Sequence, residues 1–350
     1  MSDKKVVVGI THGDINGISY EVIIKTFRDS RIFDFCTPVI YGSPKVAAYH
    51  RKALNIDNFS FTTVQSADEL SIKKANIINC LDDNIRVELG KSTSMAGESA
   101  IISLENAVND LADGKIDVLV TSPLSHRNTK NDTLNFKGHT QYLMEKFNTQ
   151  DTLILMTSEL MRVGVVSGHV PLSEVSKYVT EENILKKLRI LNKALTEDFA
   201  IRKPKIAVLG LNPHAGDGGV IGKEESEIIM PAIDKANKED ILALGPFSAD
   251  SFFGSENFTK FDAILSMYHD QGIAPFKALN FDTGVNYTAG LPIIRTTPNH
   301  GTAYEIAGLD KASPNSFREA VYMACNIYKN RKQYAKLNEN LLPSYDVADK

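Results

Sequence analysis

DAILSMYHDQGIAPFKALNFDTGVNYTAGLPIIRTTPNHGTAYEIA, residues 262–307, carries more polar chemistry in a short length than any other part of the chain. It opens with an apolar run, residues 263–267, whose length and edges are typical of a buried strand. His269 and Asp270 follow this run closely, and in open α/β sheets ligands bind at the carboxyl ends of the strands. The stretch then supplies a lysine, an amide and an arginine: Lys277, Asn286 and Arg295. These groups suit a site for a small anionic, hydroxylated molecule beside a metal ion.

Outside this stretch, apolar runs of strand length alternate with amphipathic patterns of helical spacing. We expect strands at residues 6–10, 38–41, 117–121, 151–156, 162–166 and 205–210, and small strands within 55–88. We expect helices at residues 20–28, 98–112, 141–147, 173–198, 223–238 and 317–329. Thr140 is a candidate cap for the third helix. The gap between the fourth and fifth strands is too short for a crossover helix, so this pair should be antiparallel. The pattern predicts an α/β fold with a doubly wound, mixed sheet.

Composition excludes several classes of protein. With 350 residues, 43% apolar and 23% charged, the chain is typical of a soluble globular protein of two domains. A net charge of −4 with scattered Lys and Arg gives no surface for nucleic acid. Three distant cysteines predict neither a disulfide framework nor a thiolate zinc site, which fits a cytoplasmic protein. No apolar run is long enough for a signal peptide or a membrane span, so we expect no membrane partner.

Histidines recur in one context, which is an apolar strand followed by a short break. Three imidazoles suffice to bind Zn²⁺ or a similar divalent ion and leave coordination positions open for catalysis. The pattern selects five residues and does not choose among them: His12, His126, His169, His214 and His269. A histidine at a strand end is more often a hydrogen-bonded loop residue. Neighbours favour His214, which precedes a glycine-rich loop, and His269, which Asp270 can orient.

The glycine-rich loop at residues 216–222 is not a dinucleotide-binding fingerprint. Its spacing differs, and Glu224 and Glu225 open the next helix where a pyrophosphate would need to lie. Asp250 is either a turn or cap residue or an active-site carboxylate.

The ordered motifs THGDINGIS, TSPLSHR, GHTQYL, GHVPLSEV, GLNPHAGDGGVIGKEE, GPFSADSFF, YHDQGIAPFK, GVNYTAGLPIIRT and NHGTAYEIAG resemble those of the 4-hydroxythreonine-4-phosphate dehydrogenases. These are enzymes of pyridoxal phosphate biosynthesis, and the resemblance covers nearly the whole chain. It implies a divalent metal (Zn, Mg or Co) bound by His169, His214 and His269, in a site shared across a homodimer. It implies substrate-binding residues at His139, Thr140, Lys277, Asn286 and Arg295. Asp250 and Asp270 would support the catalytic site.

The same resemblance implies a fold similar to that of isocitrate and isopropylmalate dehydrogenases, with two α/β/α domains. We expect residues 1–130 plus 290–350 in one domain and residues 131–289 in the other, which would carry the metal ligands and the dimer interface. NHGTAYEIAG is similar to the loop that holds the adenosine part of NAD in those enzymes. His300, Gly301 and Thr302 are therefore the expected contacts to NAD or NADP.

Two departures from the family pattern stand out. The first motif usually reads like TPGDPxGIGPE, and other residues replace its prolines and a glycine here: His12, Ile15, Ser19 and Tyr20. The turn after the first strand should therefore be less rigid. The position after TSPLS, often lysine in the family, is His126, which puts substrate contacts near it in doubt.

The activity that the resemblance implies is NAD(P)-linked oxidation of 4-phosphohydroxy-L-threonine to 2-amino-3-oxo-4-phosphooxybutanoate. Decarboxylation then gives 3-amino-2-oxopropyl phosphate. A paralogous dehydrogenase of another phosphorylated hydroxy acid, such as 4-phosphothreonate, would carry nearly the same motifs. A three-histidine metal hydrolase is a more remote alternative, and a metal-dependent binding protein has little support.

Overall fold

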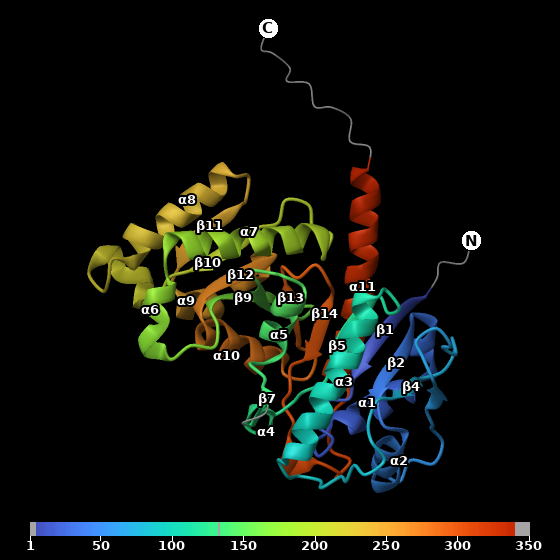
Figure 1. Cartoon of the computed structure of the whole chain (residues 1–350). Helices are drawn as coiled ribbons and strands as arrows, with labels where there is room; N and C mark the ends of the chain where they lie inside the picture. The colour runs from blue at the N-terminus through green and yellow to red at the C-terminus, as the bar shows by residue number, and fades with distance from the viewer. Residues whose placement is uncertain (1–4, 132–133, 340–350) are drawn as a thin grey trace.

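A computed structural model describes residues 5–131 and 134–339. Strands and helices alternate along the chain, as the sequence predicts (Figure 1). The N-terminal part contains β1 (Val6–Thr11), α1 (Ser19–Phe27), η1 (Ser30–Asp34), β2 (Cys36–Gly42), α2 (Pro44–Ala53), β3 (Thr62–Val64), β4 (Asn76–Asn79), α3 (Ser94–Ala112) and β5 (Val118–Thr121). A short connection follows, with α4 (His126–Thr129), β6 (Lys130–Asn131), β7 (Leu134–Asn135) and α5 (His139–Lys146).

The middle and the C-terminal part continue the alternation. The middle contains β8 (Leu153–Thr157), β9 (Arg162–Ser167), η2 (Leu172–Glu174), α6 (Val175–Tyr178), α7 (Glu181–Glu197), β10 (Ile206–Leu209), η3 (Pro213–Gly219), η4 (Glu225–Ile229) and α8 (Met230–Lys238). The rest contains β11 (Ala243–Phe247), α9 (Ala249–Gly254), η5 (Asn257–Lys260), β12 (Ala263–Tyr268), α10 (His269–Asn280), β13 (Val285–Ala289), β14 (Arg295–Pro298), η6 (Tyr304–Ile306) and α11 (Asn315–Asn338).

Within the described residues, twelve strands form one sheet in the order β11-β10-β12-β9-β8-β13-β14-β5-β1-β2-β4-β3. The sheet is mixed, because β8 pairs antiparallel with both β9 and β13, and β13 pairs antiparallel with β14. The antiparallel pair predicted from the short gap is therefore confirmed. The expected domain boundary at residue 289 falls between β13 and β14, which hydrogen-bond to each other, so the sheet continues across it. The domain division itself stays a prediction.

Alternation of side chains along the strands explains why helices cover both faces of the sheet. In β1, Val6, Val8 and Ile10 join a hydrophobic cluster with Phe27 of α1 and Phe317 of α11. Residues 7 and 119 face the opposite way, into a second cluster with the apolar side of α3. In the other half, α7 and α8 cover one face and α9 and α10 cover the other (Figure 1).

Two local predictions are wrong, and a further helix was not predicted. The single helix expected at residues 173–198 is broken, and α7 starts anew where the Thr180 side chain accepts a hydrogen bond from the Asn183 amide. Thr140 is not a cap, because α5 begins at His139 and Gly138 occupies the cap position. Residues 269–280 form α10, a helix that was not predicted from the sequence, with Pro275 inside it.

Candidate functional site

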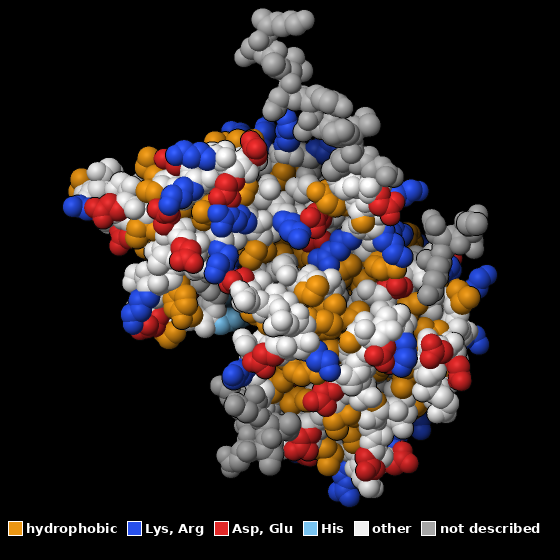
Figure 2. Space-filling view, turned by 45° about the horizontal axis from the view of Figure 1, so that its top comes forward, with side chains coloured by type: hydrophobic (Ala, Val, Ile, Leu, Met, Phe, Trp, Pro, Cys, Tyr) orange, Lys and Arg blue, Asp and Glu red, His pale blue; other side chains and the backbone are white. Residues whose placement is uncertain are grey.

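A cavity of about 370 Å³ collects residues from elements that are far apart in the sequence. It is lined by eight of the predicted site residues: His139, His169, His269, Lys277, Asn286, Arg295, His300 and Gly301. On the face shown in Figure 2, histidine side chains are visible at a notch between two parts of the molecule, while Lys, Arg, Asp and Glu are intermixed elsewhere.

Regular structure explains why these side chains share one cavity. On α10, residues four apart lie on the same side of the helix, and His269, Ile273 and Lys277 all line the cavity. On β14, Arg295 and Thr297 are two residues apart and therefore project from the same face of the strand.

Arg295 is the most unusual group in the cavity. It is 4% exposed, and its burial lowers the pKa of the guanidinium to about 10. Its described partners are two hydroxyls, with Nε donating to Thr121 at 2.8 Å and Nη1 donating to Thr288 at 3.1 Å. Among the described residues no carboxylate pairs with it. A buried charge without a counter-ion is costly, so the cavity is suited to an anion.

Further cavity-lining groups are buried without a hydrogen-bond partner among the described residues. They are Asn286 Oδ1, His300 Nε2 and both polar atoms of Asn299. Buried polar groups are nearly always satisfied, so such a concentration indicates a ligand site. Asn299 was not predicted. An asparagine between Pro298 and His300 is typical of an ordinary turn. The only feature of the sequence that indicated a functional role was its position in the NHGTAYEIAG motif.

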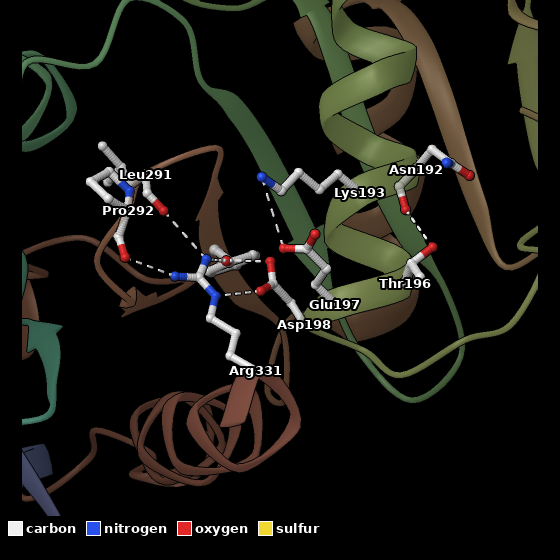
Figure 3. A network of polar contacts seen from close by, with 9 residues as sticks. Asn192, Lys193, Thr196, Glu197, Asp198, Leu291, Pro292 and Arg331 are labelled. Atoms are coloured by element: carbon white, nitrogen blue, oxygen red, sulfur yellow. Dashed lines mark hydrogen bonds and ion pairs between the residues drawn. The ribbon is translucent and has the colours of Figure 1, made fainter. Parts of the chain in front are cut away.

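One larger cavity elsewhere lacks this character. A cavity of about 820 Å³ lies between α7 and α11, and its basic side chains are ion-paired. Figure 3 shows Arg331 at its wall, where Nε donates to Asp198 at 2.6 Å and Nη1 donates to the Pro292 carbonyl at 3.0 Å. Lys193 pairs with Glu197 in the same region. Arg331 joins α11 to the residue that follows α7, and each of these charged groups is balanced by its partner.

The imidazoles of His169 and His269 are close together, with ring centroids 5.6 Å apart and planes inclined by 40°. When Nδ1 of His269 carries the proton it donates to Asp270 Oδ1 at 2.7 Å, which leaves Nε2 free to bind a metal. The contact that the sequence suggested between these neighbours is present.

His214 lies on the turn after β10, outside the residues that line the cavity. β10, β12 and β9 are parallel neighbours, so the turns that carry His214, His269 and His169 leave the same edge of the sheet. Within one chain the three imidazoles do not converge. In the described ranges no three His, Cys, Asp or Glu side chains could hold a metal ion. The donor chemistry of His169 and His269 therefore fits a metal whose remaining protein ligand comes from elsewhere.

Four more predicted residues lie outside the cavity lining: Asp250, Thr140, Thr302 and Asp270, which contacts His269. Asp250 is exposed on α9, and hydrogen bonds from Ser248 and the Ser251 backbone, with a smaller effect of nearby His214, lower the pKa of its carboxyl. Thr140 follows His139 on α5. Thr302 accepts a hydrogen bond through its carbonyl from the Ile18 amide at 3.0 Å, which ties the expected cofactor loop to the first motif.

The residues that depart from the family pattern are packed rather than exposed. His12, Ile15, Ser19 and Tyr20 are all fully buried. His12 stacks on Tyr20, and Tyr20 stacks on His50, with centroids 5.6 and 5.2 Å apart. The expectation about His126 concerns a side chain outside the described part of the structure.

A mixed α/β sheet that places a buried cation and two neighbouring imidazoles in one cavity is suited to a small anionic molecule. Comparison with known proteins makes this class specific. The family model described as "Pyridoxal phosphate biosynthetic protein PdxA" matches residues 34–324. The chain is 48% identical over 334 residues to a 4-hydroxythreonine-4-phosphate dehydrogenase from Bacteroides thetaiotaomicron, which covers 95% of this chain and 92% of that protein. The chain belongs to this family.

Other matches refine the comparison. A relative from Oceanobacillus iheyensis, 36% identical across 93% of this chain and 98% of its own length, has a name that refers to D-threonate 4-phosphate dehydrogenase. A crystal structure of 4-hydroxythreonine-4-phosphate dehydrogenase from Klebsiella pneumoniae superposes with a TM-score of 0.80 at 28% identity, over 93% of this chain and all of that one. An isocitrate dehydrogenase from Methylococcus capsulatus shares the fold alone, with a TM-score of 0.50 at 12% identity over 95% of this chain and 89% of that one.

Proposed function

We propose that the chain oxidises 4-phosphohydroxy-L-threonine with NAD⁺ or NADP⁺ to 2-amino-3-oxo-4-phosphooxybutanoate. Loss of CO₂ from this β-keto acid then gives 3-amino-2-oxopropyl phosphate, a step in pyridoxal 5′-phosphate biosynthesis. The observation that carries the proposal is Arg295, a buried cation with no carboxylate partner among the described residues, in a cavity lined by four histidines. Family membership supplies the class of reaction.

The cavity residues have distinct roles in this proposal. Arg295 and Lys277 hold the anionic ends of the substrate, and the low dielectric around Arg295 strengthens its attraction for an anion. Asn286, with His139 and Thr140 on α5, binds the polar groups between those ends. Held at several points, the substrate presents the carbon that carries the hydroxyl in one orientation, which lowers the entropic part of the barrier.

The expected cofactor loop lies beside the substrate groups, because His300 and Gly301 line the same cavity. His300 and Gly301, with Thr302 next to them, would hold NAD(P)⁺, which supplies the hydride acceptor. The Thr302 carbonyl contact to Ile18 keeps this loop against the first motif.

His169 and His269 would hold a divalent ion such as Zn²⁺, Mg²⁺ or Co²⁺, together with His214 of the partner subunit. When bound, such an ion supplies Lewis-acid chemistry for alcohol oxidation and for decarboxylation. Asp270 fixes the orientation of His269, and Asp250 lies near His214.

A homodimer completes the site in this proposal. β11 is an edge strand of the sheet, and apolar side chains around it and the His214 turn are exposed: Val220, Ile221, Leu242 and Leu244. An exposed apolar sheet edge is unfavourable in water and is typical of an interface. A second copy that covers this surface would bring its His214 to the incomplete metal site.

In the part of the chain that the structure describes, no helix is both long and apolar enough to cross a membrane. The cytoplasm stays the predicted compartment.

The test is cofactor reduction with synthetic 4-phosphohydroxy-L-threonine, followed at the absorbance of the reduced nicotinamide, with and without a chelator. We expect turnover that a chelator abolishes and that added Zn²⁺, Mg²⁺ or Co²⁺ restores. Lack of reduction under all these conditions would contradict the proposal. Cleavage of the substrate by water without cofactor reduction would favour a hydrolase.

A second candidate function is oxidation of 4-phospho-D-threonate, favoured by the name of the Oceanobacillus iheyensis relative. Both substrates carry the phosphate, but only 4-phosphohydroxy-L-threonine carries an amino group. Parallel measurement of kcat/KM for both compounds decides between the functions.

A further inference from the structure

The turn that carries His214 has an unusual backbone. Five successive residues, 214–218, have φ angles of 52°, 51°, 80°, 45° and 64°, so the chain forms a left-handed turn. His214, Ala215 and Asp217 carry side chains that disfavour this conformation. Strain of this kind persists only where the surroundings hold it, and it concentrates at functional sites.

A buried carboxylate holds this turn in place. Glu225 is 4% exposed, and its Oε1 accepts hydrogen bonds from the backbone amides of Leu211 at 2.8 Å and Asn212 at 2.7 Å. Its Oε2 accepts from Asn212 Nδ2 at 3.0 Å. Within the described ranges no Lys or Arg pairs with Glu225, so its described donors all belong to the base of the turn.

The top of the turn also packs against Glu225. A Cβ atom added at Gly216 would lie 2.6 Å from Glu225 Oε2, so the carboxylate fills the space that a side chain would need. The Ile221 amide donates to the Gly216 carbonyl at 3.0 Å and closes the turn. Glu225 lies at the start of the π-helical segment η4, and π-helical turns are frequent at functional sites.

A second contact joins this turn to the element that carries His269. Gln271 Nε2 donates to the Gly210 carbonyl at 2.6 Å, and its Oε1 accepts from the Met267 amide at 2.7 Å. The end of β10 and the start of α10 are therefore held at a fixed separation.

We infer that Glu225 is a positioning residue for the metal site and sets the direction in which His214 leaves the surface. This inference rests on the proposed function, in which His214 completes the site of a second copy. A ligand that must reach into another subunit needs a rigid base, because each rotation of an exposed turn displaces its imidazole.

The experiment compares Glu225→Gln with Glu227→Gln, an exposed glutamate two residues further along the same segment. Glutamine keeps the size of the side chain and removes the charge that strengthens its three hydrogen bonds. The first readout is hydrogen–deuterium exchange of residues 210–222 in the dimer without metal. We expect faster exchange in Glu225→Gln alone, with no change in residues 263–280.

The second readout is Co²⁺ binding with the visible absorption spectrum of the bound ion. We expect Glu225→Gln to weaken Co²⁺ binding roughly 10–100-fold and to alter the spectrum. In a His214→Ala background the same change should have no further effect, because the positioned ligand is gone. Glu227→Gln should bind Co²⁺ as the unmodified protein does.

The outcomes separate the two ideas. Unchanged Co²⁺ affinity in Glu225→Gln, or an equal loss with and without His214, would overturn the positioning role while His214→Ala still loses the metal. Full affinity in His214→Ala would overturn the ligand assignment itself and with it the inference. If Glu225→Gln does not fold, Asn212→Ala removes one of the three hydrogen bonds and should show a smaller loss of the same kind. Unchanged affinity in that variant would overturn the inference.

Discussion

Arg295 is a charged side chain that is unfavourable to bury and well placed to bind an anion. Its guanidinium is buried with two threonine hydroxyls as its described partners, and its pKa falls to about 10 because the charged form is desolvated. Removing a buried charge often leaves stability unchanged or raises it, whereas removing the partner of a bound anion weakens binding.

Arg295→Met keeps the volume of the side chain and removes the charge. We expect KM for the phosphorylated substrate to rise about 100-fold, in line with the loss of a buried charge-assisted contact, and KM for NAD(P)⁺ to change little. The melting temperature without ligand should not fall. Steady-state kinetics and calorimetry check both parts, and an equal rise in the two KM values would argue against an anion-binding role.

Single residues could be predicted only in part from the sequence. The strand-end rule selected five histidines, yet His12 is a buried stacking residue while His169 and His269 line the cavity. The rule cannot tell these apart because local sequence does not encode what packs against a strand end. The direction of His214 was equally hidden, because it depends on Glu225, eleven residues further along the chain.

At the level of elements, most strands and helices were predictable because burial on two faces imposes their periodicity. α10 was not. Gly272 and Pro275 weaken its intrinsic helix propensity, and the helix forms because Ile273 and Phe276 are buried in the cluster against β9 and β12. Strands β13 and β14, within residues 285–298, were also not predicted, because the many polar residues there obscure the apolar periodicity.

The stacked group of His12, Tyr20 and His50 makes the N-terminal part sensitive to acid. Desolvation lowers the pKa of both histidines to about 4, from 6.5 in the unfolded chain. The unfolded state therefore binds protons first as the pH falls. The free energy of unfolding should be highest above pH 6.5 and should fall as the pH drops toward 4. The loss should be on the order of 3 kcal/mol for each histidine once both are protonated.

Urea unfolding between pH 7.5 and 5 checks this slope. His50→Gln keeps a side chain that can hydrogen-bond to the Ile15 carbonyl but cannot titrate, so the slope should be shallower. The same slope in His50→Gln as in the unmodified protein would show that His50 does not contribute to the pH dependence of stability.

The ion pair in Figure 3 should stabilise the packing of α11 without contributing to catalysis. Arg331 contacts Asp198, whose side chain is 4% exposed, and breaking a buried pair leaves an uncompensated charge. Arg331→Met should lower the free energy of unfolding by about 3–5 kcal/mol while kcat stays unchanged. Arg189→Met breaks an exposed pair with Glu239 and should cost at most about 1 kcal/mol. A large change in kcat for Arg331→Met would contradict a purely structural role.

At the scale of the whole molecule, the alternation of strands and helices predicted a doubly wound sheet. One short gap between two strands predicted that the sheet is mixed. It did not predict that the described strands form a single sheet of twelve, because β13 and β14 join the two halves through pairings with strands distant in sequence. The same topology gathers the parallel ends of β9, β12 and β10 at one edge and still leaves His214 apart from the other two histidines. Within one chain the proposed metal site is incomplete.

Subunit complementation tests the shared site directly. His214→Ala and His269→Ala should each be inactive as homodimers, and exchange of subunits in an equal mixture should restore activity. Random pairing gives one intact site in each mixed dimer, so the mixture should reach about a quarter of the activity of the unmodified protein in NAD(P)⁺ reduction with 4-phosphohydroxy-L-threonine. No recovery after proven exchange would contradict a site built from two copies of the chain.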